Sequence, residues 1–348
     1  MTDELRQTWS DGHLDKVRVV PAATPLPPLP KLPDRTAIQQ LNGYVQQLTD
    51  NHLFSGVVMV GRAGKPIYAH AFGLADRATG LPNQTSSLFN LASLNKIITA
   101  TAVLQLVEAG KLSLDTRLQD VIPDEVKGTP AANIQIQNLL SHTSGLMDSY
   151  DKLAFPPGSS FAYSNMGYGV LGKVIEAVSH LKYEDYVRLH ITGPTGMSFL
   201  DIYEAIAPVE ELTTGYAPSV AKGSLQWVAN PLLQTWPGNS IGAFWSTAGD
   251  LLKFAEALRK GRLLHQSTVR LMRAAKPELG APDYGFGVIR WRGPGIWGHA
   301  GDLPGTSADL EMHCNDDLVL IALSNRDAST APVMAKARQL FFHGSCNI

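Results

Sequence analysis

Cysteine is scarce in this 348-residue chain, and neither sign of charge dominates it. The two cysteines, Cys314 and Cys346, form no CxxC pair, so neither a disulfide framework nor a single bridge between them is favoured. The 29 lysines and arginines are balanced by 31 acidic residues, which gives a formal net charge of −2 at pH 7. Because no basic surplus is available to neutralise phosphates, we expect no nucleic-acid partner and no anionic membrane partner.

Long apolar runs and metal-binding patterns are also missing. No run of 18 or more apolar residues occurs, so no membrane span is predicted. The first residues, MTDELRQTWSDGHLDK, have neither a basic start nor an apolar stretch, so no signal peptide is predicted in this chain. The ten histidines are scattered without HExxH spacing, and neither a metal nor another cofactor is expected. The compartment and the oligomeric state are left open.

The composition is that of a globular protein, with 44% apolar and 17% charged residues. A chain of this size can bury one large core or two unequal lobes. Six prolines within residues 21–34 predict an extended segment, and we assign residues 1–35 to a Pro-rich N-terminal arm. One folded domain is predicted over residues 36–346.

Predicted strands lie at both ends of this domain, around a middle with mostly helical spacing. Apolar residues at helical spacing after Ala37 predict a helix, and residues 55–76 predict two strands joined by a turn. Three more strands are predicted between residues 295 and 325, before a closing helix. We therefore predict an α+β fold, in which an antiparallel β-sheet is flanked by terminal helices and carries an inserted, mostly helical lobe. The sheet lobe would comprise residues 36–92 and 262–346, and the helical lobe residues 93–261.

Ser93 and Lys96 form a Ser-x-x-Lys element at the start of a long apolar helix predicted over residues 91–110. Residues three apart share one face of a helix, so the Lys96 amine can reach the Ser93 hydroxyl. An ester or amide carbonyl is attacked at neutral pH only by an activated hydroxyl of this kind. The chain has three other Ser-x-x-Lys pairs, none of which opens such a helix: Ser149/Lys152, Ser179/Lys182 and Ser219/Lys222.

Two further motifs follow, and each occurs once in the chain. Tyr163 and Asn165 form a Tyr-x-Asn element, in which the phenol could relay a proton from the serine and the amide could orient the lysine and the substrate carbonyl. His299 and Gly301 form a His-x-Gly element on a late strand. Gly301 would let a substrate approach the backbone closely, and His299 is expected to hydrogen-bond the Tyr163 phenol. By itself, each element is more often a capping turn or a structural histidine.

In this order, the three motifs resemble those of the serine β-lactamase-related superfamily, which includes class C β-lactamases, DD-peptidases, D-amino-acid amidases and family VIII carboxylesterases. Residues 139–146 (LLSHTSGL) and 246–251 (STAGDL) are also similar to segments of that family. The similarity extends over residues 36–345, nearly everything after the arm. The resemblance implies a serine hydrolase that acts through an acyl-enzyme on a small-molecule ester or amide.

The resemblance also implies a role for each motif residue. Ser93 would be the acylated nucleophile, Lys96 its activator and Tyr163 the proton shuttle. Asn165 matches a supporting amide, and His299 stands where many relatives have lysine. Lysine and tyrosine both titrate near pH 10 when free, so either needs a lowered pKa to act as a base. Which of the two is the general base is left open. His142, in the LLSHTSGL segment, is expected to brace its loop rather than to take part in the reaction.

The third motif departs from the family in an informative way. The oxyanion hole is implied to consist of the backbone N–H groups of Ser93 and Asp302. In relatives that act on penicillins or D-Ala peptides, hydroxyl residues around this motif help to hold the substrate carboxylate. Here those positions are Ala300 and Asp302, and an ionised Asp302 would repel a carboxylate by about 1–4 kcal/mol. The sequence thus favours a neutral ester, or a substrate with a free amine.

Several activities fit these motifs. A carboxylesterase is favoured, and a β-lactamase, a D-amino-acid peptidase or amidase, an acyltransferase and a covalent sensor without turnover are the alternatives. Residues 238–242 (GNSIG) match the nucleophile elbow of α/β-hydrolases around Ser240. That elbow needs a strand before it and a helix directly after it, whereas two prolines precede this segment and the next helix begins later. Relatives are often exported, but the compartment stays unpredicted.

Overall fold

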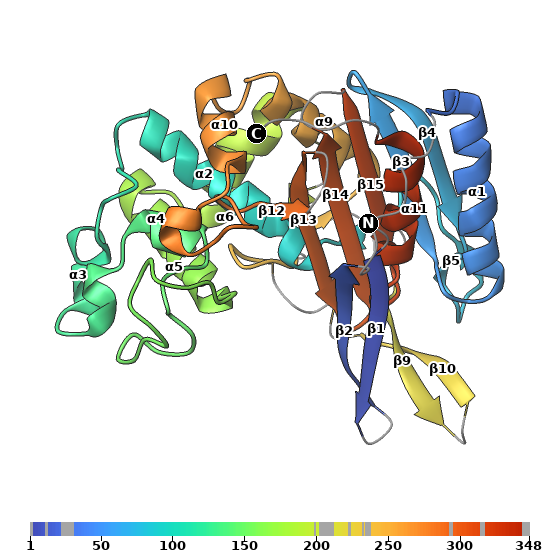
Figure 1. The fold of residues 1–348 in the computed structure, drawn as a ribbon, viewed down its shortest axis with the longest axis horizontal. Coiled ribbons are helices and arrows are strands. Elements are labelled where there is room, and N and C mark those ends of the chain that lie inside the picture. Colours follow the sequence, from blue (N-terminus) through green and yellow to red (C-terminus); the bar gives the residue numbers. More distant parts are fainter. Residues whose placement is uncertain are drawn as a thin grey trace.

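The fold is described from a computed structural model that covers residues 3–10, 13–21, 31–197, 200–201, 212–221, 224–231, 233, 238–291, 295–313 and 317–342. Cys314, Cys346 and Lys222, which the sequence analysis considered, lie outside these residues. At the centre is a six-stranded antiparallel sheet with the order β12-β13-β14-β15-β3-β4 (Figure 1). Its strands are β3 (Gly56–Arg62), β4 (Lys65–Phe72), β12 (Ile289–Trp291), β13 (Ile296–Leu303), β14 (Thr306–His313) and β15 (Leu318–Ser324).

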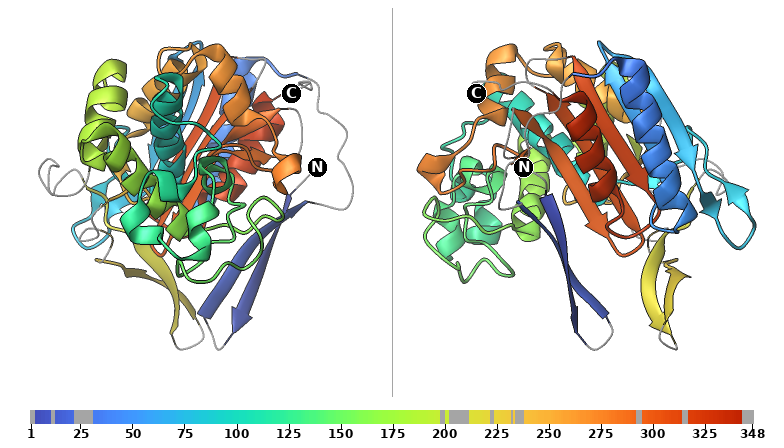
Figure 2. Two further views of the ribbon diagram at one scale, coloured as in Figure 1. Left: turned by 90° about the vertical axis from the view of Figure 1, so that its left-hand side faces the viewer. Right: turned by 45° about the vertical axis from the view of Figure 1, so that its right-hand side comes forward.

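Two terminal helices cover one face of this sheet. In α1 (Asp34–Asp50), Ala37, Leu41 and Val45 recur every four residues and are buried, because this spacing keeps apolar side chains on one side of a helix. They share a hydrophobic core with α11 (Thr330–Phe341) and with the outward face of β3 and β15. Figure 2 shows both helices lying against the sheet.

The other face of the sheet packs against α2 (Lys96–Glu108) and α9 (Ala248–Arg259), which connect it to the helical lobe. All residues of β14 and β15 are buried, as expected for central strands covered on both faces. The other α-helices within the described residues are α3 (Pro123–Val126), α4 (Ile136–Leu140), α5 (Asn165–Ser179), α6 (Tyr183–Val187), α7 (Gly193–Thr195) and α10 (Gln266–Arg273).

Two hairpins project from the same edge of the molecule in Figures 1 and 2. One pairs β1 with β2 within the predicted N-terminal arm, and the other pairs β9 with β10 within the predicted helical lobe. Neither hairpin was predicted. Their strands are β1 (Asp3–Ser10), β2 (His13–Pro21), β9 (Tyr216–Ala221) and β10 (Ser224–Ala229). The short strands are β5 (Leu74–Asp76), β6 (Leu81–Pro82), β7 (Phe89–Asn90), β8 (Leu200–Asp201) and β11 (Trp245–Ser246).

The predicted fold class is confirmed: an antiparallel sheet is assembled from both ends of the chain, and mostly helical segments lie between. The helix α1 begins at Asp34, two residues before the predicted boundary of the domain. The division into an arm and two lobes stays a prediction. Among the described residues, no helix has both the length and the apolar character needed to cross a bilayer.

Candidate active site

Ser93 lies on a short 3-10 helix, η1 (Ala92–Asn95), that leads directly into α2. The preceding residue, Ala92, has φ +45°, a conformation that L-residues rarely adopt. The Asn90 side chain accepts a hydrogen bond from the Ala92 N–H at 2.9 Å, and the Ala243 N–H donates to the Ala92 carbonyl at 3.1 Å. Because these contacts hold the strained turn, Ser93 is presented, half-buried, where the sheet and the helical lobe meet.

Lys96 is fully buried, one helical turn after Ser93. Its Nζ atom lies 3.0 Å from Ser93 Oγ and donates to the Ile241 carbonyl at 2.7 Å. Burial disfavours the charged amine and lowers the pKa of Lys96 from 10.5 to about 7. A large fraction of the amine is therefore neutral near pH 7 and can accept the hydroxyl proton of Ser93.

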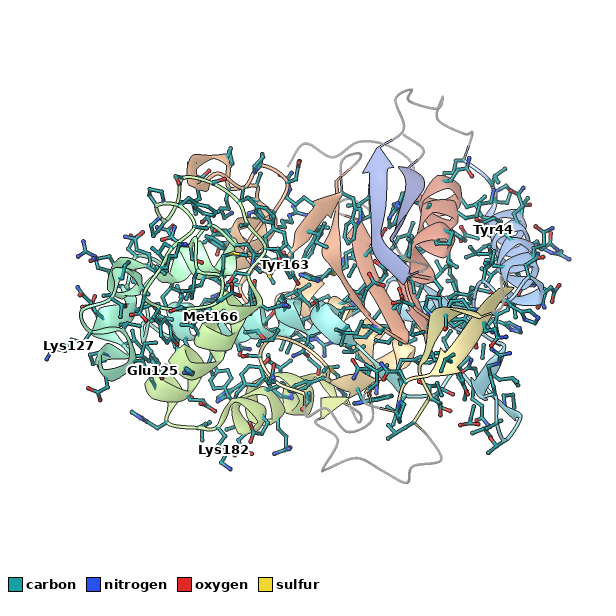
Figure 3. The ribbon with its side chains drawn as sticks, turned by 90° about the horizontal axis from the view of Figure 1, so that it is seen from below. Tyr44, Glu125, Lys127, Tyr163, Met166 and Lys182 are labelled. Carbon is teal, nitrogen blue, oxygen red and sulfur yellow. The ribbon has the colours of Figure 1, made fainter. Side chains whose placement is uncertain are left out.

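Tyr163 completes this group from the loop that precedes α5. The phenol is hydrogen-bonded to Ser93, and the ring centroid lies 5.0 Å from Lys96 Nζ. Although the side chain as a whole is 39% exposed, the surrounding protein encloses the hydroxyl end and raises the pKa of the phenol. Figure 3 shows Tyr163 on the side of the helical lobe that faces the sheet, whereas Glu125 and Lys127 lie at the far end of that lobe.

His142 fixes the loop that carries Tyr163. Its Nδ1 atom accepts the Ser164 N–H at 3.1 Å, and its carbonyl accepts the Ala162 N–H at 2.9 Å. The imidazole lies 4.2 Å from the Tyr163 ring and 4.9 Å from the Tyr168 ring, between centroids. Burial and the nearby Lys96 charge lower the pKa of His142 well below its usual value, so the ring stays neutral. These contacts agree with the bracing role expected for this residue.

Gly301 brings β13 against the nucleophile. A Cβ atom at this position would lie 2.6 Å from the Ser93 nitrogen and 2.3 Å from the Leu91 carbonyl oxygen, so only glycine fits. The Ser93 N–H stands at the start of η1, where a helix offers no acceptor of its own. The close approach places Asp302 directly after this contact, and the two N–H groups assigned to the oxyanion hole come from segments that touch.

His299 is buried on β13, but its partner is not the one expected. Its Nδ1 atom lies 2.6 Å from the Ala300 carbonyl, which can only accept, so the proton is on Nδ1. Nε2 therefore accepts from the Tyr284 hydroxyl, at 2.9 Å. The expected hydrogen bond to Tyr163 is wrong in this structure, because Tyr284 occupies the ring nitrogen. Burial and Lys96 lower the pKa of His299 to about 3, so the ring is neutral.

Asn165, like His299, lacks the contact that the sequence analysis expected. It is the first residue of α5 and its side chain is exposed, with no hydrogen bond to Lys96. The Ile241 carbonyl orients the lysine instead. The proposed contact between the Asn165 amide and the substrate carbonyl stays a prediction.

The GNSIG segment contributes to the site in a way that the sequence did not reveal. It forms no strand-turn-helix elbow, and Ser240 is buried, with its carbonyl accepting from the Thr99 hydroxyl at 2.8 Å. The next carbonyl, that of Ile241, is the one that accepts from Lys96. Within the described part of the chain, no three potential metal ligands cluster together. Tyr284 and Ile241 are the two contributors that motif reasoning missed.

Comparison with known proteins places this geometry in a family. Residues 41–344 match the family model described as Beta-lactamase. Penicillin-binding protein 4* of Bacillus subtilis is 28% identical over 84% of this chain and 72% of its own length. The esterase EstB of Burkholderia gladioli is 32% identical over 70% of this chain and 76% of its own length. A penicillin-binding protein from Bacillus halodurans superimposes with a TM-score of 0.73 at 26% identity, over 89% of this chain and all of that one.

The fold and the Ser93–Lys96–Tyr163 group are those of a serine β-lactamase- or transpeptidase-like protein. The chain belongs to the Beta-lactamase family, as the sequence motifs implied. Members of this family include penicillin-binding proteins and an esterase, so the family as such does not fix one substrate.

Proposed function

We propose that this protein is a serine hydrolase that cleaves carboxylic esters through an acyl-enzyme on Ser93. The observation that carries the proposal is the hydrogen bond of 3.0 Å between the buried Lys96 amine and the Ser93 hydroxyl. A lysine in a core without an acidic partner is costly, and the cost is understandable where a neutral amine serves as a base. The name of the relative EstB, an esterase, supports the same reaction class.

The two candidate bases are separated by the directions of their pKa shifts. Burial lowers the pKa of Lys96 to about 7 and raises that of Tyr163. At neutral pH the phenol therefore keeps its proton while much of the amine lacks one. We assign Lys96 as the general base and Tyr163 as the group that passes the proton onward to the leaving group.

In the first step, Ser93 Oγ bonds to the carbonyl carbon and its proton moves to Lys96 Nζ. The carbonyl oxygen becomes an oxyanion, which the N–H groups of Ser93 and Asp302 stabilise. Collapse breaks the bond to the alcohol oxygen, which takes a proton from Lys96 through Tyr163. Water then attacks the acyl-serine by the same route in reverse and releases the acid.

The residues around the third motif favour neutral esters over penicillins and D-Ala peptides. Ala300 offers no hydroxyl to a substrate carboxylate, and Asp302 places a like charge beside the oxyanion hole. Even at an effective dielectric between that of water and a protein surface, such a pair is unfavourable by about 1–4 kcal/mol at contact distance. Carboxylate-bearing substrates should consequently bind weakly.

A small substrate panel tests the proposal. Wild type, Ser93→Ala and Ser240→Ala are compared on p-nitrophenyl butyrate, a chromogenic cephalosporin and D-alanyl p-nitroanilide. We expect wild type and Ser240→Ala to hydrolyse the butyrate ester fastest and Ser93→Ala to lose this activity. Faster hydrolysis of the cephalosporin than of the ester would contradict the proposal, and so would an active Ser93→Ala variant.

The same panel separates the alternative activities. Mass spectrometry of the quenched reaction should show an acyl adduct on the peptide that contains Ser93. Product release beyond one equivalent per protein distinguishes an enzyme from a covalent sensor. Addition of methanol distinguishes hydrolysis from acyl transfer, because a transferase would yield mainly the methyl ester.

A further inference from the structure

Asp302 lies beside the candidate active site. It directly follows Gly301, whose backbone touches the Ser93 nitrogen, and its side chain is exposed. The carboxylate is close enough to Tyr163 that its charge contributes to the raised pKa of the phenol. A substrate carbonyl held by the oxyanion hole would therefore have this carboxylate as a neighbour.

No lysine or arginine neutralises Asp302 in the described part of the chain. Burial raises the pKa of Asp302, and Ser307, its partner in the β13–β14 register, partly offsets this by donating a hydrogen bond to the carboxylate. Ser307 is itself within 2.5 Å of the Thr330 hydroxyl, so its orientation is fixed from behind by α11. A hydroxyl stabilises a carboxylate but does not cancel its charge, so Asp302 carries a net negative charge beside the site whenever it is ionised.

A second carboxylate reinforces this charge. Asp327 lies in the loop between β15 and α11, and burial together with the Asp302 charge raises its pKa to about 6. Two acids that disfavour each other's ionisation are both stabilised by a cation placed between or beside them. The neighbours of Asp302, the Ser307 hydroxyl and the Asp327 carboxylate, match a protonated amine and oppose an anion.

We infer that Asp302 is a specificity-determining residue that selects ester or amide substrates carrying a positively charged amine near the scissile carbonyl, with Asp327 as a weaker second contributor. The inference rests on the proposed acyl transfer at Ser93 and names the substrate class of that same site. The amine can belong to the acyl group or to the leaving alcohol, and both positions have the same charge chemistry.

Two pairs of esters of matched shape test the inference and separate these two positions. β-Alanine methyl ester and methyl butyrate differ in the acyl group by an ammonium in place of a methyl group. Acetylcholine and 3,3-dimethylbutyl acetate differ in the alcohol by a quaternary nitrogen in place of a carbon. Acid release at pH 7.5 and low salt gives kcat/KM for all four, and the cationic-to-neutral ratio within each pair is the readout.

The variants are Asp302→Asn and Asp327→Asn, with Asp120→Asn as the matched control. Asp120 is an exposed acid in the helical lobe, away from the site residues. We expect the wild-type ratio to be about tenfold in at least one pair, the size of one partly screened charge pair. Asp302→Asn should bring that ratio close to one, Asp327→Asn should lower it about twofold, and Asp120→Asn should leave it unchanged. Because each ratio is taken within one variant, a general change in activity does not affect it.

Each outcome supports or overturns the inference. A ratio near one in both pairs, with the neutral esters hydrolysed, overturns it and leaves the proposed function intact. A wild-type preference that survives Asp302→Asn also overturns it, because the amine is then recognised elsewhere. If Ser93-dependent hydrolysis of every ester is absent, the proposed function fails and the inference fails with it.

Discussion

The candidate site has a helical wall and a sheet wall, and the two differ in the charge of their ionisable side chains. On the helical side, Lys96, Tyr163 and His142 are held by several contacts each, and the pKa shifts of all three favour their neutral forms. On the sheet side, Asp302 and Asp327 bring two carboxyl groups near the site, and burial raises the pKa of both. Proton transfer benefits from the enclosed, neutral wall, and substrate selection is left to the open, charged one. Substitutions on the two walls should therefore have different signatures.

The largest effect is expected from removing the base in the enclosed wall. Lys96→Met keeps a similar length and apolar stem but cannot accept the Ser93 proton, so kcat/KM for a neutral ester should fall about 10²–10⁴-fold. The free energy of unfolding should be unchanged or higher, because a buried amine is replaced by an apolar group. Ester hydrolysis and urea unfolding measure the two quantities. A variant that keeps more than a tenth of the wild-type rate would show that another group is the base.

The next largest loss of activity is expected from a substitution at Gly301, where β13 contacts the segment that carries Ser93. In Gly301→Ala, the new Cβ would fall 2.6 Å from the Ser93 nitrogen, so β13 must move away and the oxyanion hole must open. Loss of one oxyanion donor predicts a decrease in kcat of about 10²–10³-fold, measured by ester hydrolysis.

Gly43→Ala is the matched control for this substitution. Gly43 lies in the middle of α1, and nothing is within 4 Å of a Cβ atom built there. Alanine should therefore leave the rate unchanged and stabilise the protein by about 0.5–1 kcal/mol. Normal kcat in Gly301→Ala would contradict the placement of the oxyanion hole beside Gly301.

A smaller effect is expected from pH, because kcat/KM should follow the protonation of Lys96 on the helical wall. With a pKa of about 7 for Lys96, protonation removes the base as the pH falls, so kcat/KM should rise through pH 7 to a plateau. At pH 6 the rate should be about a tenth of the plateau value. Tyr163 and His299 do not titrate in this range, because burial raises the pKa of the first and lowers that of the second to about 3.

Asp327 also titrates close to this pH range, since its pKa is raised to about 6. Asp327→Asn therefore serves as the control for the pH profile of a neutral ester. The midpoint near pH 7 should remain in this variant. If it moved or disappeared, the acidic limb would report the sheet-side carboxylate rather than Lys96.

The sequence predicted the reacting residues of the site better than the groups that orient them. Ser93, Lys96 and Tyr163 were found because each residue type is required by the reaction and the order of the motifs is that of the family. The Ile241 carbonyl could not be found in this way, because every residue has a backbone carbonyl and only the fold decides which one reaches the lysine. Asn165 was expected to orient Lys96 because it belongs to the Tyr-x-Asn motif, but the Ile241 carbonyl makes that contact instead.

The fold shows the same division. Strands β3 and β15 have continuous apolar runs, and their pairing from distant parts of the chain followed from the position of strands at both ends. The hairpin of β9 and β10 was missed because small residues dominate β9, so no period-2 apolar pattern stands out there. Local pattern predicts an element when burial imposes that pattern, and these strands lie outside the central sheet.

The smallest expected effect on catalysis concerns Tyr284, which contacts His299 and not the nucleophile. Tyr284→Phe leaves the buried Nε2 atom of His299 without its donor, so the free energy of unfolding should fall by about 1–3 kcal/mol. The rate of ester hydrolysis should fall only a few-fold. Tyr68→Phe removes a comparable hydrogen bond, of 3.0 Å to Asn42, at the half-buried outer edge of the sheet, and should cost less stability in the same urea titration.

Tyr163→Phe provides the comparison on the enclosed wall, because its hydroxyl is bonded to Ser93 itself. We expect it to lower the rate about 10–100-fold more than Tyr284→Phe, as a proton-transferring group should. Equal losses of rate in the two variants would mean that the phenol of Tyr284, through neutral His299, belongs to the reacting group. Tyr284 and His299 would then count among the residues that transfer the proton, together with Lys96 and Tyr163.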